Sequence, residues 1–136
     1  MLVDSFGRIH NYLRISLTEA CNLACTYCMP DNDFNLQRKF KMSATEIVAL
    51  AKIFTDLGTE KIRITGGEPL VRKDASEIIL ALGNLKASGL KSLAITTNGI
   101  LVHNYIEVFK QAGIQSVNVS LDTLMADRFT KISKRD

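Results

Sequence analysis

The sequence lacks an apolar run long enough to cross a membrane, and its amino terminus lacks the basic-then-apolar pattern of a secretory signal. It also lacks a strong excess of one charge, because the formal net charge is +3 and the basic residues are scattered. A surplus this small does not indicate binding to nucleic acid. We therefore expect neither a membrane segment nor a nucleic-acid partner. The 136 residues, 46% of them hydrophobic, are enough for one domain.

Cysteine is rare and occurs in one short segment, at Cys21, Cys25 and Cys28. The odd number argues against a closed set of disulfides. The only two histidines, His10 and His103, lie outside this segment, so a four-ligand zinc site would need a ligand from elsewhere. Three thiolates so close in sequence can instead hold one face of an iron-sulfur cube. A chance cluster of thiols, one of them buried in the core, remains an alternative from spacing alone.

Such a set of thiolates favours a reducing compartment, because thiols carrying iron and sulfide do not persist where disulfides form. The expected location is therefore cytoplasmic.

The rest of the sequence alternates strand and helix patterns. Strands are predicted at 12–17, 61–65, 92–97 and 116–121. Helices are predicted at 43–58, 74–89 and 101–112. The first helix begins with the capping box at Ser43 and Glu46, and Asp74 is expected to cap the second in the same way. Connections of this length require parallel strands joined by right-handed crossovers.

The predicted strands have one apolar and one polar face. Leu13, Ile15, Ile62, Ile64, Leu93, Ile95, Val117 and Val119 form the apolar set, which is expected to pack against helices. The polar set is Arg14, Ser16, Arg63, Thr65, Ala94, Thr96, Asn118 and Ser120. Parallel strands buried on both faces are usually apolar throughout. The pattern therefore favours an α/β fold whose sheet, part of an incomplete barrel, faces a ligand cavity; a sheet with one partly solvated side is the alternative.

Six motifs in order resemble one family. They are Asp4–Arg8, Tyr12–Ser16 leading to the cysteines, Tyr27–Pro30, Lys61–Leu70 with its Gly-Gly-Glu-Pro, Thr96–Gly99, and Val117–Asp122. Together they resemble the radical S-adenosylmethionine superfamily and, within it, the molybdenum cofactor biosynthesis protein A family of GTP 3',8-cyclases. The resemblance implies a partial (β/α) barrel of the radical SAM type, with about four parallel strands and three helices. The whole chain, 1–136, would be the amino-terminal part of that core domain.

The resemblance implies two cofactors, a [4Fe-4S] cluster held by Cys21, Cys25 and Cys28, and S-adenosylmethionine. Reductive cleavage of S-adenosylmethionine to a 5'-deoxyadenosyl radical would start the cyclisation of GTP to a pyranopterin precursor. Carried over by position, Tyr27, Gly67 and Ser120 would contact S-adenosylmethionine. Gly67 would do so because a side chain there would block the approach of the backbone.

The resemblance also implies GTP contacts at Arg14, Arg63 and Thr96. Both arginines interrupt apolar strands and fall on the polar face, where an unpaired charge is costly without an anion. The alternative is that Arg63 pairs with Glu68 or another carboxylate.

The sequence departs from the family in two ways. Thr18-Glu19-Ala20 precedes the first cysteine where the family has an aspartate and an arginine, and the family's chains are more than twice as long, with a second cluster near their carboxyl end. Expected partners are therefore GTP, an electron donor, and either a missing carboxy-terminal half or a second copy of the chain. A non-catalytic cluster-binding remnant, a split subunit and another radical SAM maturation enzyme are alternative interpretations.

Overall fold

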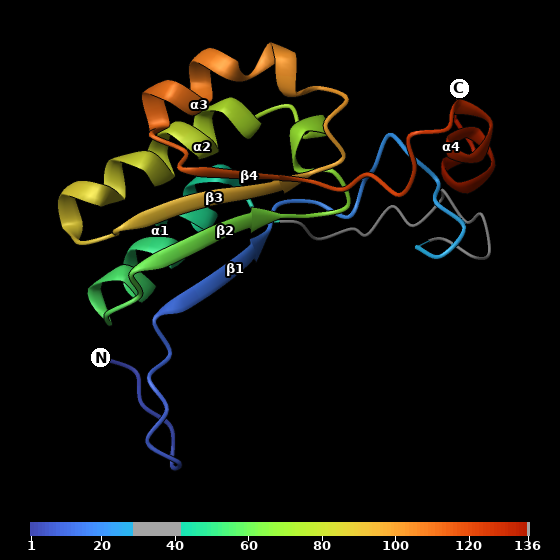
Figure 1. Cartoon of the computed structure of the whole chain (residues 1–136). Helices are drawn as coiled ribbons and strands as arrows, with labels where there is room; N and C mark the ends of the chain where they lie inside the picture. The colour runs from blue at the N-terminus through green and yellow to red at the C-terminus, as the bar shows by residue number, and fades with distance from the viewer. Residues whose placement is uncertain (29–41, 136) are drawn as a thin grey trace.

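The computed structural model describes residues 1–28 and 42–135 and contains one sheet of four parallel strands (Figure 1). The strands are β1 (Tyr12–Ser16), β2 (Lys61–Thr65), β3 (Ser92–Thr97) and β4 (Ser116–Val119). They lie side by side in chain order. Within the described residues β1 and β4 are edges, so the sheet is open. This confirms the predicted α/β fold with a partial barrel.

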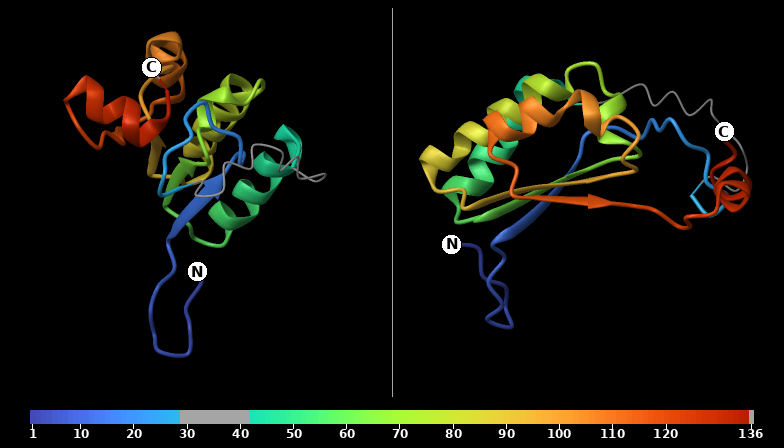
Figure 2. Two further views of the ribbon diagram at one scale, coloured as in Figure 1. Left: turned by 90° about the vertical axis from the view of Figure 1, so that its right-hand side faces the viewer. Right: turned by 45° about the horizontal axis from the view of Figure 1, so that its top comes forward.

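Three helices cover one face of the sheet, α1 (Ala44–Asp56), α2 (Ala75–Asn84) and α3 (Ile106–Ala112), as the two views of Figure 2 show. The predicted capping box of α1 is present: the Ser43 hydroxyl accepts a hydrogen bond from the Glu46 backbone, and the Glu46 carboxylate accepts one from the Ser43 backbone at 2.7 Å. The core lies between sheet and helices. Its fully buried side chains include Ile62, Ile64, Leu93 and Ile95 from the sheet and Ile78, Ile79 and Leu82 from α2.

The predicted role of Asp74 as a helix cap is wrong. Asp74 occupies the N-cap position of α2 but makes no capping hydrogen bond. Its carboxylate instead binds the guanidinium of Arg72, with Arg72 Nε to Asp74 Oδ1 at 2.6 Å. Arg72 is buried and lies only two residues from Asp74. Its charge-assisted hydrogen bonds to the Asp74 carboxylate are stronger than those that the backbone N–H groups of α2 would make.

Two predicted helices are shorter than expected, because each includes a turn of 3₁₀ helix. The second continues past α2 as η2 (Leu85–Ser88), and the third begins as η3 (Val102–Asn104) before α3. The third 3₁₀ turn is η1 (Pro69–Val71), which follows β2. Helix ends commonly tighten in this way.

A fourth helix, α4 (Ala126–Ser133), was not predicted. Its eight residues are mostly polar, and Phe129 and Ile132 alone give too short an apolar repeat to stand out in the sequence. In Figure 1, α4 lies beyond the carboxyl ends of the strands, apart from α1, α2 and α3.

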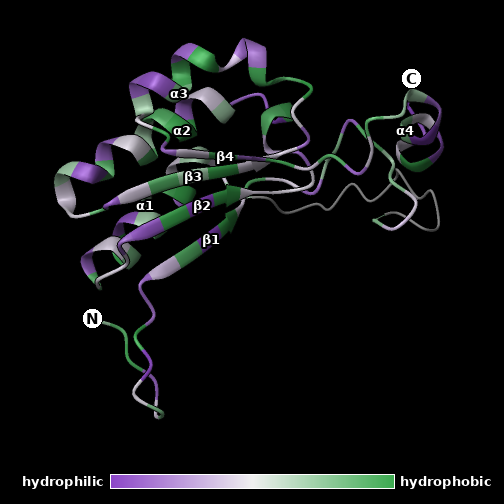
Figure 3. Ribbon diagram, in the orientation of Figure 1, coloured by the Kyte–Doolittle hydropathy of each residue, from purple (hydrophilic) through white to green (hydrophobic). Residues whose placement is uncertain are grey.

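The other face of the sheet carries the predicted polar side chains, and hydrophilic and hydrophobic residues alternate along β2 (Figure 3). Arg14 is exposed and Arg63 and Thr96 are half-buried. The prediction that helices cover the apolar side of all four strands fails for β4, where Val117 and Val119 are 40% and 54% exposed. β4 is an edge strand, so its side chains have neighbours on one flank only.

The first ten residues form a hairpin that projects from the amino end of β1 (Figure 1). Val3 and Ile9 pair across it, and Gly7 takes a positive φ of 77° in its turn. The Asp4 carboxylate accepts hydrogen bonds from the backbone N–H groups of Phe6 and Arg8. In the part of the chain that the structure describes, no helix is long and apolar enough to cross a membrane.

Candidate functional site

The predicted site residues gather at the carboxyl ends of the parallel strands and on the polar face. The cysteine loop, residues 18–28, follows β1, the Gly66-Gly67-Glu68 segment follows β2, Asn98 follows β3, and Ser120 follows β4. Ser120 is held beside β3 by a hydrogen bond from its N–H to the Thr97 carbonyl at 2.9 Å. Loops at this edge of a parallel α/β sheet are the usual place for ligands.

The two glycines after β2 pack against the start of the cysteine loop. The N–H of Gly67 donates to the Thr18 carbonyl at 2.7 Å, and that of Glu68 donates to the Ala20 carbonyl at 2.8 Å. A Cβ on Gly67 would lie 2.5 Å from the carbonyl oxygens of both Glu19 and Ala20. Gly67 is therefore required for close packing of two backbone segments, a reason that the sequence did not reveal.

The cysteine loop carries the three thiols in one turn-rich segment. Cys21 Sγ accepts a hydrogen bond from the Leu23 N–H at 3.4 Å, and the Cys28 N–H donates to the Cys25 carbonyl at 2.9 Å. Burial raises the pKa of Cys25, and the nearby thiols of Cys28 and Cys21 raise it further. Across residues 1–28 and 42–135, however, no three His, Cys, Asp or Glu side chains are arranged to hold a metal ion. The fold thus brings the thiols into one loop without converging them on a single point.

Glu68 forms a buried polar network that joins three strand ends, and its importance was missed. Its carboxylate is only 1% exposed and accepts hydrogen bonds from the Thr97 hydroxyl at 2.8 Å and the Asn98 N–H at 2.7 Å. The Asn98 side-chain amide in turn lies 2.7 Å from Asn22 Oδ1 and 3.9 Å from Cys21 Sγ. Glu68 and Asn98 each lie in one of the six motifs that resemble the family, and this could have identified them from the sequence. The network fixes the first cysteine relative to β2 and β3.

The helix α4, which the sequence did not predict, holds the middle of the cysteine loop. The N–H groups of Ala24 and Thr26 donate to the carbonyls of Ser133 and Ile132, at 2.9 and 3.0 Å. These carbonyls belong to the last turn of α4, which lacks intrahelical partners for them. The cysteine loop and the carboxyl end of α4 lie together in Figure 2, as these bonds require.

Tyr27 is linked to the segment after β4. Its hydroxyl donates to Asp122 Oδ2 at 3.0 Å, and this hydrogen bond is the main reason that the pKa of Tyr27 is raised. Asp122 lies two residues beyond Ser120, so two of the predicted cofactor contacts are connected through it.

On the polar face, the structure brings Arg63 and Thr96 together and places Arg14 beside them. Arg63 Nη1 donates to the Thr96 hydroxyl at 3.2 Å, and Arg63 Nε donates to the Tyr12 hydroxyl at 2.9 Å. Arg14 is the register partner of Arg63 on the neighbouring strand. In the described parts of the chain, neither arginine forms an ion pair.

The alternative that Arg63 pairs with Glu68 is therefore not observed. Lys61, two residues before Arg63 on β2, shares the same strand face and was missed, although its place in the alternation could have revealed it. Its ammonium lies 5.4 Å from the centre of the Tyr12 ring. The polar face thus carries three cations on two adjacent strands.

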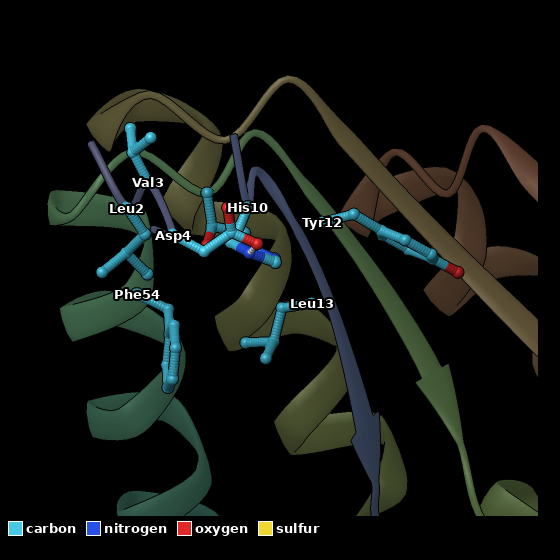
Figure 4. Close-up of a pocket in the computed structure, with 8 residues that line it drawn as sticks. Leu2, Val3, Asp4, His10, Tyr12, Leu13 and Phe54 are labelled. Carbon is cyan, nitrogen blue, oxygen red and sulfur yellow. Dashed lines mark hydrogen bonds and ion pairs between the residues drawn. The ribbon is translucent and has the colours of Figure 1, made fainter. Parts of the chain in front are cut away.

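A pocket of about 420 Å³ lies at the amino end of the sheet (Figure 4). It is lined by the hairpin together with Tyr12, Leu13, Phe54 and Thr59, so it shares Tyr12 with the polar face. The cysteine loop and the Gly66-Gly67-Glu68 segment, at the opposite edge of the sheet, do not line it.

The fold and the cysteine loop together define the class of protein. The family model of the radical SAM superfamily matches residues 15–136, and the chain belongs to that superfamily. The crystal structure of BtrN in complex with AdoMet and 2-DOIA has a similar fold, with a TM-score of 0.68 and 19% identity over 95% of this chain and 52% of that one. Membership implies S-adenosylmethionine and an iron-sulfur cluster as cofactors.

The relatives found by sequence similarity belong to a narrower group within this superfamily. The chain is 54% identical to "GTP 3',8-cyclase, mitochondrial" of Arabidopsis thaliana, over 99% of this chain and 34% of the relative. It is 50% identical to "Molybdenum cofactor biosynthesis protein 1" of Dictyostelium discoideum, over 99% of this chain and 21% of the relative. It is 44% identical to "GTP 3',8-cyclase" of Listeria monocytogenes, over 98% and 40%. The chain thus spans well under half the length of each of these relatives.

Proposed function

We propose that this chain provides the cluster-binding and S-adenosylmethionine-binding part of a GTP 3',8-cyclase of molybdenum cofactor biosynthesis. The observation that carries the proposal is the arginine pair, Arg14 and Arg63, on the open face of a sheet whose carboxyl edge bears three thiols. Two adjacent cations that have no carboxylate partner among residues 1–28 and 42–135 favour a polyanionic ligand such as a triphosphate. The names of the relatives support the same substrate.

The donor set fits an iron-sulfur cluster. Cys21, Cys25 and Cys28 are soft ligands on one loop, and their number leaves one metal position for another molecule. When bound, a [4Fe-4S] cluster supplies the electron for reductive cleavage of S-adenosylmethionine to a 5'-deoxyadenosyl radical. Binding requires that Cys25 lose its proton, and because its pKa is raised in the free chain, cluster assembly should release protons.

The chain's own residues would position the second cofactor. Tyr27 and Gly67 would present backbone groups to S-adenosylmethionine, and Ser120 would contact it from the end of β4. Support comes from their shared location at the carboxyl edge of the sheet and from the Tyr27–Asp122 hydrogen bond, which holds the loop near Ser120.

Arg14, Arg63 and Thr96 would bind the phosphates of GTP, with Lys61 adding charge. The Thr96 hydroxyl already orients the Arg63 guanidinium, so little side-chain entropy remains to be lost on binding. We assign the cofactor step and phosphate binding to these 136 residues. An external electron donor completes the scheme.

The test is GTP binding by the purified chain. Replacing Arg14 or Arg63 by Ala should weaken binding by roughly 1–3 kcal/mol each, as expected when a charge-assisted phosphate contact is lost. Lys52→Ala is the matched control, because Lys52 lies on α1 and pairs with Asp56 on the helical side.

Cluster content should be the same in the unchanged chain and in every one of these variants. Unchanged GTP affinity in the Arg14→Ala, Arg63→Ala double variant contradicts the triphosphate assignment. Tighter binding of a peptide than of GTP favours a maturation enzyme of the same superfamily.

A further inference from the structure

Arg72 makes an unusual set of contacts for a residue outside the sites described so far. It follows η1 and is only 5% exposed. Its Nη1 donates to the Leu17 carbonyl at 2.7 Å, and its Nη2 donates to the Met42 carbonyl at 2.8 Å. Its Nε and Nη2 also bind the two oxygens of Asp74, at 2.6 and 2.9 Å.

The two carbonyls flank the segment that contains every cysteine. Leu17 is the residue that follows β1, and residue 18 begins the cysteine loop. Met42 directly precedes Ser43, the N-cap of α1. One guanidinium therefore binds the chain where it leaves the sheet and where it enters the first helix.

Arginine is well suited to this task and lysine is not. The planar guanidinium offers five N–H donors in a fixed fork, so it can bind two carbonyls and a carboxylate at once. Asp74 neutralises the charge, which makes burial tolerable. Leu17 is 2% exposed, so loss of the arginine would leave its buried carbonyl without this donor.

Direct cofactor binding does not explain Arg72. Its donors are directed at backbone carbonyls and at Asp74, and its side chain is 2% exposed, which leaves no surface for a ligand. A purely structural ion pair explains Asp74 but not the two carbonyls from separate segments.

We propose that Arg72 is a positioning residue for the cluster: by binding the carbonyls of Leu17 and Met42, it fixes the chain before and after the cysteines. The expected effect of Arg72 on cluster retention rests on the proposed function. Immobilisation of the cysteine loop by Arg72 does not depend on a bound cluster, and it is tested in the cluster-free chain.

The test compares backbone amide hydrogen exchange in the cluster-free chain for Arg72→Lys, Arg72→Met and Leu82→Ala. Arg72→Lys keeps the charge next to Asp74 but cannot bind both carbonyls, so it is the variant expected to fold. Leu82→Ala is the control, because Leu82 is fully buried on α2 and its loss weakens the core without touching Arg72. In the Arg72 variants, amides of residues 18–28 should exchange on the order of tenfold faster, while amides of β2 and β3 keep their protection.

Leu82→Ala should instead accelerate exchange in the strands at least as much as in the loop. The proposal is wrong if Arg72→Lys exchanges like the unchanged chain, or if it accelerates loop and strands equally.

Iron loss to a chelator after anaerobic reconstitution is the second readout. Arg72→Lys should lose iron on the order of tenfold faster than Leu82→Ala, as expected for a residue that orients the metal ligands without binding the metal itself. Equal rates overturn the link to the cluster. If the unchanged chain takes up no iron, the proposed function fails, and hydrogen exchange still decides the role of Arg72.

Discussion

At the scale of single residues, Gly67 and Glu68 have different structural roles, although they are neighbours in the same motif. Gly67 allows the backbone after β2 to pack closely against the backbone before Cys21. The Glu68 carboxylate links the end of β2 to the end of β3 by hydrogen bonds. The motif therefore has a structural role in holding the cysteine loop, in addition to the cofactor contact proposed for Gly67.

Gly67→Ala should displace the cysteine loop, because its Cβ would lie 2.5 Å from two carbonyl oxygens. We expect a loss of about 1–3 kcal/mol in the free energy of unfolding, the usual cost of overpacking, and a large fall in iron bound per chain. Denaturant unfolding and iron analysis measure the two effects.

Gly83→Ala is the matched control for this prediction. Its Cβ would lie 2.6 Å from the Ala112 carbonyl, between α2 and α3 and away from the loop. It should cost similar stability and leave iron per folded chain unchanged. Equal iron loss in both variants would show that the effect of Gly67 is general and not local to the loop.

Asp4 predicts a pH dependence confined to the amino-terminal hairpin. Its pKa is lowered from 3.8 to about 2, mainly by the hydrogen bond from the Arg8 backbone, so the folded hairpin favours the carboxylate. Its contribution to hairpin stability is therefore fully present above pH 3.8 and is lost as the pH falls through about 2. In NMR titrations, the amide signals of Phe6 and Arg8 should shift in this range.

Asp4→Asn serves as the control, because it removes the titrating group. Its hairpin amides should not respond between pH 4 and pH 2. A titration midpoint for Asp4 near 3.8 contradicts the assigned hydrogen bonds.

At the scale of elements, the sequence predicted the strands and helices that have a periodic apolar pattern. It did not predict the features that depend on contacts between residues far apart in the chain. The strands and α1 follow from alternation and from the Ser43 capping box. Asp74 was misassigned because its partner, Arg72, is buried by packing that no local pattern reports. α4 was missed because it is stabilised by carbonyl contacts to the cysteine loop, far away in sequence. The site residues Arg63 and Thr96 were predicted to share a face, but their hydrogen bond depends on the register of β2 and β3.

The outer edge of β4 leads us to expect that the chain self-associates. Within the described residues β4 pairs with β3 alone, and its exposed apolar side chains continue to Leu121, which is 54% exposed. Unpaired strand edges of this kind promote association. Sedimentation velocity should show oligomers that grow with concentration, and Val119→Lys should shift the population towards monomer.

Ile53→Lys is the control for the edge, since Ile53 is 56% exposed on α1 and not on β4. It should leave the distribution unchanged. A chain that stays monomeric across the micromolar range would contradict the role assigned to the edge.

At the scale of the whole molecule, three supports meet at the cysteine loop. The Gly66-Gly67-Glu68 segment holds its beginning, α4 holds its middle through Ala24 and Thr26, and Arg72 binds the chain on either side of it. The open polar face with its cations extends from the same strands. The layout places the residues proposed for cofactor binding at one edge of the sheet and those proposed for phosphate binding on its open face.

The most direct test of this account is S-adenosylmethionine cleavage by the chain after anaerobic reconstitution with iron and sulfide. With dithionite as reductant, we expect about four irons per chain, a reducible cluster by electron paramagnetic resonance, and formation of 5'-deoxyadenosine. Replacing any one of Cys21, Cys25 or Cys28 by Ser should abolish 5'-deoxyadenosine formation. Uptake of zinc alone, or a fully reconstituted cluster that yields no 5'-deoxyadenosine, would contradict the account.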